Sequence, residues 1–196
     1  MALHPYDEDF TVTRAHLQEK TMKQHRLQEG RVISMRRDDA LLPDGKPCTR
    51  EVIEHPGGVV ILPILPDGRL ILVEQWRYAL NRTLIEAPAG KLDPGEAANP
   101  IEAARRELLE ETGYRTGHIR EMTSIFTSPG FCDERLWIYL ASDLTAVDNH
   151  DDHKMDDEFI DMHHVTPEEA MAWVREGRIV DAKTITALWF LLADGR

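Results

Sequence analysis

Residues 90–114 read GKLDPGEAANPIEAARRELLEETGY, and this stretch decides how the chain folds and what chemistry it carries. Asn99 is a favourable N-cap and Pro100 suits the first helical position, so the sequence predicts a helix that begins here. The helix is expected to end at Gly113, because glycine is common just past a helix C-terminus. Its core-facing apolar stripe consists of Ile101, Ala104 and Leu108.

Three glutamates of this helix are predicted to lie on one face. Glu107, Glu110 and Glu111 stand three or four positions from one another or adjacent, and residues at these spacings are neighbours on a helix surface. Their repulsion costs about 0.2–0.5 kcal/mol per pair, so a functional ridge needs a compensating charge. Hard divalent cations prefer oxygen ligands, and Mg²⁺ leaves positions for water and substrate phosphates. Arg106, one turn before Glu110, can pair with it and hold part of the ridge in place.

The pattern around the ridge separates a metal site from an ordinary helix surface. A run such as ARRELLEE, taken alone, is typical of a solvated helix face with Arg–Glu pairs. The longer segment, however, resembles the Nudix box: Gly, five residues, Glu, seven residues, Arg-Glu, an aliphatic residue, any residue, Glu-Glu, any residue, Gly and an apolar residue. These positions are filled by Gly90, Glu96, Arg106, Glu107, Leu108, Glu110, Glu111, Gly113 and Tyr114.

The chain departs from this pattern at one point. Nine residues, 97–105, separate Glu96 from Arg106 where the pattern has seven. Because the helix is predicted to start at Pro100, we expect the two extra residues to lengthen the preceding loop and leave the register of the carboxylates intact. Glu96 is the member of the box whose place this change affects most.

The resemblance continues outside the box. Residues 74–78 (EQWRY), 85–90 (IEAPAG) and 127–134 (TSPGFCDE) are similar to the ADP-ribose pyrophosphatase branch of the Nudix superfamily. That branch also includes enzymes acting on GDP-mannose and other nucleotide sugars. The resemblance implies an α/β fold, the Nudix α/β/α sandwich with a mixed sheet, preceded by a small N-terminal antiparallel β element.

Two domains are expected on this basis. Residues 1–55 form the N-terminal β element, with strand-like runs at 31–36 and 49–54 around the turn signal Asp44-Gly45. These strands are too polar to fold alone, and in the family such an element commonly helps to form a dimer, so a homodimer is expected. Residues 56–196 form the Nudix hydrolase domain.

The hydrolase domain is predicted to alternate strands and helices. Two nearly continuous apolar runs, 58–65 and 70–75, indicate strands covered on both faces. Further strands are expected at 119–126, 136–141 and 159–165. Thr166-Pro167-Glu168-Glu169 is a capping-box start for a helix that ends at Gly177. A last helix begins near residue 181, with a predicted core face of Ile185, Leu188, Trp189 and Leu192.

The resemblance also implies roles for individual residues. Metal ligands are expected to be Glu107 and Glu111, with Glu110 close by, the main-chain carbonyl of Ala89, and a distal acid that fits Glu158 best. The expected ion is Mg²⁺, with Mn²⁺ as a possible substitute. Glu110 and Glu111 are therefore expected to act in catalysis, with Glu158 and, as the candidate base, Asp156. The competing interpretation of residues 156–158 is a solvated acidic loop tip.

Other residues are expected to contact the substrate. Arg77, and after it Arg50, are candidates for phosphate binding, because a guanidinium binds phosphate oxygens bidentately. Each of these arginines could equally be a surface charge. Glu134, in the loop 128–134, is a further substrate-binding candidate and the next candidate base after Asp156.

Composition excludes several classes of partner. The 196 residues include 23 Lys and Arg against 35 Asp and Glu, which gives a formal net charge of −12. Nucleic-acid binders typically carry a basic patch, so neither nucleic acid nor an anionic membrane is an expected partner. No apolar run approaches the roughly 20 residues of a membrane span, and the first residues do not resemble a signal peptide. A cytoplasmic protein is expected.

These observations lead to one expected activity and two alternatives. The expected activity is Mg²⁺-dependent hydrolysis of the diphosphate bond of ADP-ribose, to AMP and ribose 5-phosphate, or of a related nucleoside diphosphate sugar. GDP-mannose or a broader range of nucleotide sugars is the alternative substrate. A non-enzymatic nucleotide-sensing module is the other alternative, but such modules often lose box carboxylates, and Glu107, Glu110 and Glu111 are all retained.

Overall fold

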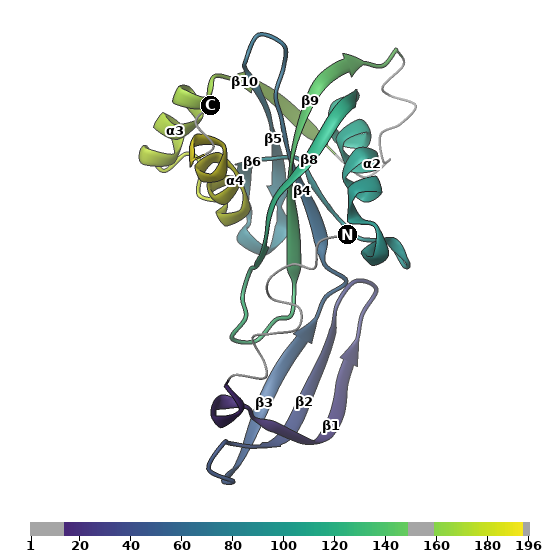
Figure 1. The fold of residues 1–196 in the computed structure, drawn as a ribbon, viewed down its shortest axis with the longest axis vertical. Helices are drawn as coiled ribbons and strands as arrows, with labels where there is room; N and C mark the ends of the chain where they lie inside the picture. Colours follow the sequence, from purple (N-terminus) through teal and green to yellow (C-terminus); the bar gives the residue numbers. More distant parts are fainter. Residues whose placement is uncertain (1–13, 149–158, 194–196) are drawn as a thin grey trace. The chain divides into compact units, whose positions relative to one another are not determined.

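Two units make up the chain in the computed structural model, which describes residues 14–148 and 159–193 (Figure 1). The first unit runs to His55 and includes Gly130–Asp133, and the second comprises Pro56–Pro129 and the residues from Glu134 onward. The segment at 130–133 belongs to the first unit because the Ile53 amide donates to the Phe131 carbonyl (2.7 Å) and the Asp133 amide donates to the Ile53 carbonyl (3.2 Å).

The first unit is a three-stranded antiparallel sheet. Its strands are β1 (Lys20–Glu29), β2 (Ser34–Leu41) and β3 (Pro47–Glu54), in that order across the sheet, after a short 3₁₀ turn, η1 (Ala15–Leu17). The β2–β3 hairpin turns at the predicted Asp44-Gly45, where Gly45 adopts a φ of 83° that favours glycine. The sequence predicted two strands here, and β1 was not expected.

Two sheets form the centre of the second unit. One is antiparallel, in the order β10-β5-β6, and the other is mixed, in the order β7-β4-β9-β8, with β4 parallel to β9. The bounds of these strands are β4 (Gly58–Pro63), β5 (Leu70–Arg77), β6 (Arg82–Glu86), β7 (Ala89–Lys91), β8 (Tyr114–Phe126), β9 (Arg135–Ala146) and β10 (Ile160–Val165). Short 3₁₀ turns, η2 (Tyr78–Leu80) and η3 (Glu96–Ala98), lie between them.

Helices cover both faces of these sheets, with α2 (Pro100–Thr112) on one side and α3 (Pro167–Arg175) and α4 (Ala182–Ala193) on the other (Figure 1). Strand β4 shows why, because all six of its residues are buried and successive side chains point to opposite faces. Val59 and Ile61 belong to the apolar cluster that includes α2, whereas Val60 and Leu62 belong to the cluster that includes α3 and α4. The predicted α/β/α sandwich with a mixed sheet and an N-terminal antiparallel element is therefore confirmed.

The helix ends follow the sequence signals. Helix α2 begins at Pro100 and is followed by Gly113 with a φ of 73°, as predicted, although the side chain of Asn99 makes no capping hydrogen bond. Helix α3 has the predicted capping box: the Glu169 amide donates to Thr166 Oγ1 (3.2 Å), and the Thr166 amide donates to Glu169 Oε2 (2.8 Å). The start of α2 at Pro100 and its end before Gly113 fix the register of the carboxylates on this helix.

The predicted core face of α4 was partly wrong. Trp189 is 58% exposed and Leu192 is also exposed, whereas the buried residues of this helix are Thr184, Ala187, Leu188 and Leu191. The helix is apolar on most of its surface, so periodicity alone did not identify which stripe faces the sheets. Within the described residues, no helix has both the length and the apolar character required to cross a membrane.

Candidate active site

Arg106 organises the outer part of the glutamate ridge. Its Nη1 donates to Glu107 Oε1 (2.8 Å) and to Glu110 Oε2 (2.9 Å), which includes the pair predicted from the sequence. Nη2 donates to Glu96 Oε2 (3.1 Å). Burial lowers the pKa of Arg106, but the hydrogen bond to Glu96 and the charges of Glu107 and Glu110 outweigh this and hold it above its ordinary value. A permanent cation therefore offsets the repulsion within the ridge.

Glu96 keeps its place in the box despite the two extra residues. Gly95, with a φ of 93°, turns the chain into the 3₁₀ turn η3, and the α-helix then begins at Pro100. The insertion is thus confined to the connection before α2. Because Glu96 still contacts Arg106, the hydrogen bond from that arginine lowers the pKa of the Glu96 carboxyl.

Glu107 is buried against the backbone of β7, at the box glycine. The residue is only 7% exposed. A Cβ atom on Gly90 would lie 1.9 Å from Glu107 Cδ and about as close to both carboxylate oxygens, which are 2.0 and 2.2 Å away. Any side chain at position 90 would therefore displace the Glu107 carboxylate, which explains why this site needs glycine.

Glu111, one turn further along α2, reaches the same strand. It is 4% exposed, and its Oε2 accepts a hydrogen bond from the Ala89 amide (3.0 Å). Glu107 and Glu111 therefore place two buried carboxylates beside consecutive residues of β7. The structure thus brings Gly90, Glu107 and Glu111 of the box together at β7.

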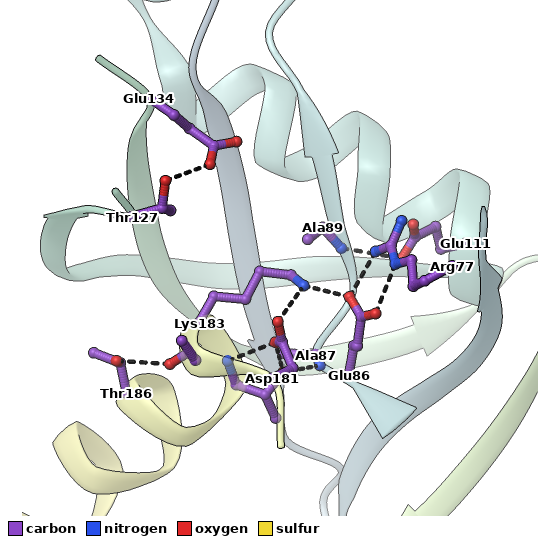
Figure 2. A network of polar contacts seen from close by, with 12 residues as sticks. Arg77, Glu86, Ala87, Ala89, Glu111, Thr127, Glu134, Asp181, Lys183 and Thr186 are labelled. Atoms are coloured by element: carbon purple, nitrogen blue, oxygen red, sulfur yellow. Dashed lines mark hydrogen bonds and ion pairs between the residues drawn. The ribbon is translucent and has the colours of Figure 1, made fainter. Parts of the chain in front are cut away.

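Arg77, at the end of β5, is bound along one edge of its guanidinium by Glu86 of β6 (Figure 2). Nε donates to Glu86 Oε1 (2.6 Å) and Nη2 donates to Glu86 Oε2 (2.5 Å). The hydrogen bonds to Glu86 raise the pKa of Arg77, and the nearby charge of Glu111 contributes to the same shift. Arg77 thus lies near Glu111 of the glutamate ridge.

Glu86 is the buried centre of a network that sequence reasoning did not identify. Its side chain is 1% exposed and accepts hydrogen bonds from both Arg77 and Lys183, which lies in the first turn of α4. Burial raises the pKa of Glu86, but these two cations outweigh it and hold the pKa below its usual range. A charged residue at the end of an apolar strand, after Leu84 and Ile85, was the available signal for a paired buried ion.

Two other predicted site residues, Arg50 and Glu134, make contacts outside the Glu86 network, and two more are not described. Arg50 is in the N-terminal unit, where its Nε and Nη2 bond to Glu19 (2.9 and 2.5 Å). Glu134 accepts a hydrogen bond from Thr127 Oγ1 (2.6 Å), and Figure 2 shows this pair apart from the network around Glu86. Asp156 and Glu158 lie outside the described residues.

Comparison with known proteins agrees with this arrangement, because residues 54–188 match the NUDIX domain model. The chain belongs to the Nudix hydrolase family. It is 40% identical to the ADP-ribose pyrophosphatase of Bacillus subtilis (strain 168) over 176 residues, which cover 89% of this chain and 93% of that protein. It is also 40% identical to a methanol dehydrogenase activator of Bacillus methanolicus (89% and 92% covered). A GDP-mannose pyrophosphatase of Yersinia enterocolitica serotype O:8 is 32% identical (74% and 78% covered).

A solved structure shares this fold. A crystal structure of an ADP compounds hydrolase superposes with a TM-score of 0.77 at 22% identity, covering 91% of this chain and 96% of that one. The Nudix identification made from the box, and the expectation that the chain is an enzyme, are confirmed.

Hydrolases of this family generally need a divalent metal ion, and the donor set at β7 fits one in part. Glu107 and Glu111 offer buried carboxylate oxygens, the ligand type that hard divalent cations prefer. Within residues 14–148 and 159–193, no three His, Cys, Asp or Glu side chains converge to form a metal site by themselves. Main-chain oxygens, water or the substrate would have to complete the coordination.

Proposed function

We propose that this Nudix enzyme hydrolyses the diphosphate bond of ADP-ribose, giving AMP and ribose 5-phosphate, in the presence of Mg²⁺. The observation that carries the proposal is the pair of buried carboxylates, Glu107 and Glu111, held against β7 beside Arg77. The ADP-ribose pyrophosphatase of Bacillus subtilis, 40% identical over most of both chains, supports ADP-ribose as the substrate.

The chemistry of a diphosphate explains why such a site is needed. Both phosphates are negatively charged, so an attacking water meets strong repulsion, and the leaving group is poor without charge neutralisation. This protein has a net charge of −12, which makes cations at the site necessary for receiving an anionic substrate. A carboxylate site that binds metal and a positioned arginine meet both requirements.

The metal would be held by Glu107 and Glu111, with the Ala89 carbonyl and Glu110 as further oxygen ligands. When bound, Mg²⁺ supplies neutralisation of the phosphate charge and lowers the pKa of a bound water. Mn²⁺ has the same ligand preference and is expected to substitute. The protein's part is to fix the ligands: Arg106 holds Glu107 and Glu110, and the Ala89 amide orients Glu111.

Arg77 is proposed to bind a phosphate oxygen. Its Nε and Nη2 are engaged by Glu86, whereas Nη1 has no hydrogen-bond partner among the described residues. This leaves one end of the guanidinium available for an anion. Glu158 as a distal metal ligand, Asp156 as a base, and Arg50 and Glu134 as substrate contacts are retained as proposals from the family resemblance.

GDP-mannose is the second candidate substrate, because a relative at 32% identity is a GDP-mannose pyrophosphatase. The cleavage would be the same, inside the diphosphate, and the products would be GMP and mannose 1-phosphate. We also propose a cytoplasmic homodimer, with the N-terminal sheet contributing to the contact between subunits.

A substrate panel tests the proposed function. Purified protein with Mg²⁺ is incubated separately with ADP-ribose, GDP-mannose, ADP-glucose and NAD⁺, and the products are identified by chromatography and mass spectrometry. The proposal expects the highest kcat/KM for ADP-ribose, with AMP and ribose 5-phosphate in equal amounts. A higher kcat/KM for GDP-mannose would replace the substrate, and no hydrolysis of any member of the panel would refute the proposal.

A further inference from the structure

We propose that Lys183, in the C-terminal helix α4, is a positioning residue for Arg77, acting through the carboxylate of Glu86 that the two cations share. The inference rests on the proposed function, because Arg77 is assigned to the diphosphate there. Helix α4 lies outside the Nudix box, and the inference gives it a part in substrate binding.

The carboxylate of Glu86 has little freedom to move. It is buried, and Figure 2 shows Arg77 and Lys183 reaching it from opposite sides. Oε1 accepts from Arg77 Nε, while Oε2 accepts from both Arg77 Nη2 and Lys183 Nζ. A carboxylate held on both sides sets the plane of the guanidinium that binds it in two places, because a bidentate pair is planar. Lys183 therefore helps to define where Arg77 points.

Lys183 is itself fixed by the start of α4. Its Nζ lies 3.0 Å from Asp181 Oδ1, and the other oxygen of Asp181 accepts from the amide (3.0 Å) and the hydroxyl (2.6 Å) of Thr184. Asp181 thus caps the helix and holds the lysine at the same time. Thr184, which is fully buried, accepts a hydrogen bond from the Ala87 amide (2.7 Å).

These contacts connect α4 to two parts of the candidate site, the segment that leads to Ala89 and the side chain of Arg77. Glu86 ends β6 and Ala87 follows it, and two residues further on Ala89 donates its amide to Glu111. Arg77 leaves Nη1 without a hydrogen-bond partner in the described part of the chain, at a place where the charge of Glu111 still acts on it. Because Lys183 and Arg77 share the Glu86 carboxylate, a change at Lys183 can reach Arg77 through it.

The test compares Lys183→Met, Lys183→Arg and Arg77→Lys, with Arg175→Met as the control that removes one exposed positive charge from α3. We expect Lys183→Met to lower kcat/KM for the hydrolysed nucleotide sugar about tenfold. Lys183→Arg should retain most of the wild-type kcat/KM, and Arg175→Met should match the wild type. In the Arg77→Lys background, Lys183→Met should have little further effect. This background keeps one cation on Glu86, so the double variant does not leave a bare buried carboxylate.

A second measurement does not need activity. The side-chain Nε–H signal of Arg77, identified in a ¹H–¹⁵N spectrum by its loss in Arg77→Lys, should shift or broaden in Lys183→Met and stay in place in Arg175→Met. If the wild type hydrolyses no nucleotide sugar, the proposed function fails and this signal alone decides the positioning role. An unchanged Arg77 signal, unchanged kcat/KM, or an equal effect of Lys183→Met in the Arg77→Lys background would each overturn the inference.

Discussion

Gly90 lies so close to the Glu107 carboxylate that position 90 has no room for a side chain. The glycine is required by contact with a side chain, since a Cβ there would overlap the Glu107 carboxylate. The obstructing group is the end of a flexible side chain, so a larger residue at position 90 would move Glu107 more readily than it would unfold the protein. This separates an effect on the metal site from an effect on stability.

Gly90→Ala is predicted to lower kcat about 10²-fold while the protein stays folded, because the displaced Glu107 carboxylate no longer lies where a metal ion needs it. Steady-state kinetics and thermal unfolding would check this. Gly130→Ala is the matched control, because nothing lies within 4 Å of a Cβ at that glycine. Wild-type turnover in Gly90→Ala would show that the position of Glu107 is not critical.

Glu111→Gln is predicted to lower kcat by about 10²-fold or more and to weaken the binding of Mg²⁺, without loss of stability. The amide oxygen of glutamine can still accept the hydrogen bond from Ala89, so only the ligand charge is removed. Glu102→Gln, on the exposed first turn of the same helix, is the control. Turnover near the wild-type level at saturating Mg²⁺ would refute the metal-site assignment.

The residues of the Nudix box could be predicted from the sequence, whereas the residues that contact them could be predicted only in part. Residues three and four positions apart on one helix share a face, so the Arg106–Glu110 pair followed from spacing alone. The contact between Glu86 and Lys183 joins residues 97 positions apart and has no local signal. Such pairs are fixed by the packing of α4 on the sheets.

Among the elements, β6 and α4 are joined by buried charges, and this makes stability depend on pH. The pKa of Glu86 is lower in the folded protein than its ordinary value of 4.5, which applies to the unfolded chain. The stability that this carboxylate contributes is therefore complete above about pH 4.5 and is lost as the pH falls through the lower folded pKa.

Glu86→Gln is predicted to reduce the free energy of unfolding at pH 7 by about 3 kcal/mol, because it leaves two cations without their shared carboxylate. It should also flatten the loss of stability on acidification below pH 4.5. Urea unfolding at pH 7 and at several values between pH 3 and 5.5 would measure both effects. Parallel pH profiles for variant and wild type would contradict the role given to this carboxylate.

The elements that the sequence predicted are those with strong local signals. The apolar runs of β4 and β5 and the capped helices α2 and α3 were found near their observed bounds. Strand β1, with the sequence KTMKQHRLQE, has no apolar alternation and exists through its pairing with β2. Strand β7 has three residues and is defined by its hydrogen bonds to β4, so its tertiary context decided it.

For the whole molecule, the N-terminal unit is predicted to be needed for assembly. Deleting Met1–His55 should yield a monomer or an insoluble protein, because its polar sheet buries few apolar side chains of its own and is proposed to contact a second subunit. Light scattering and sedimentation of the full chain and the truncated form would check this. A truncated protein that remained a fully active dimer would assign assembly to the second unit.

The position of bond cleavage distinguishes attack of water on phosphorus from attack on the sugar. The enzyme is incubated with ADP-ribose and Mg²⁺ in water enriched in ¹⁸O, and the products are analysed by mass spectrometry. Activation of water against phosphorus predicts AMP and ribose 5-phosphate, with one ¹⁸O atom on a phosphate of one product, and no turnover in the presence of a chelator. Free ADP and ribose, with the ¹⁸O atom on C5 of the ribose, would show attack on the sugar carbon instead of on phosphorus and would contradict the proposed mechanism.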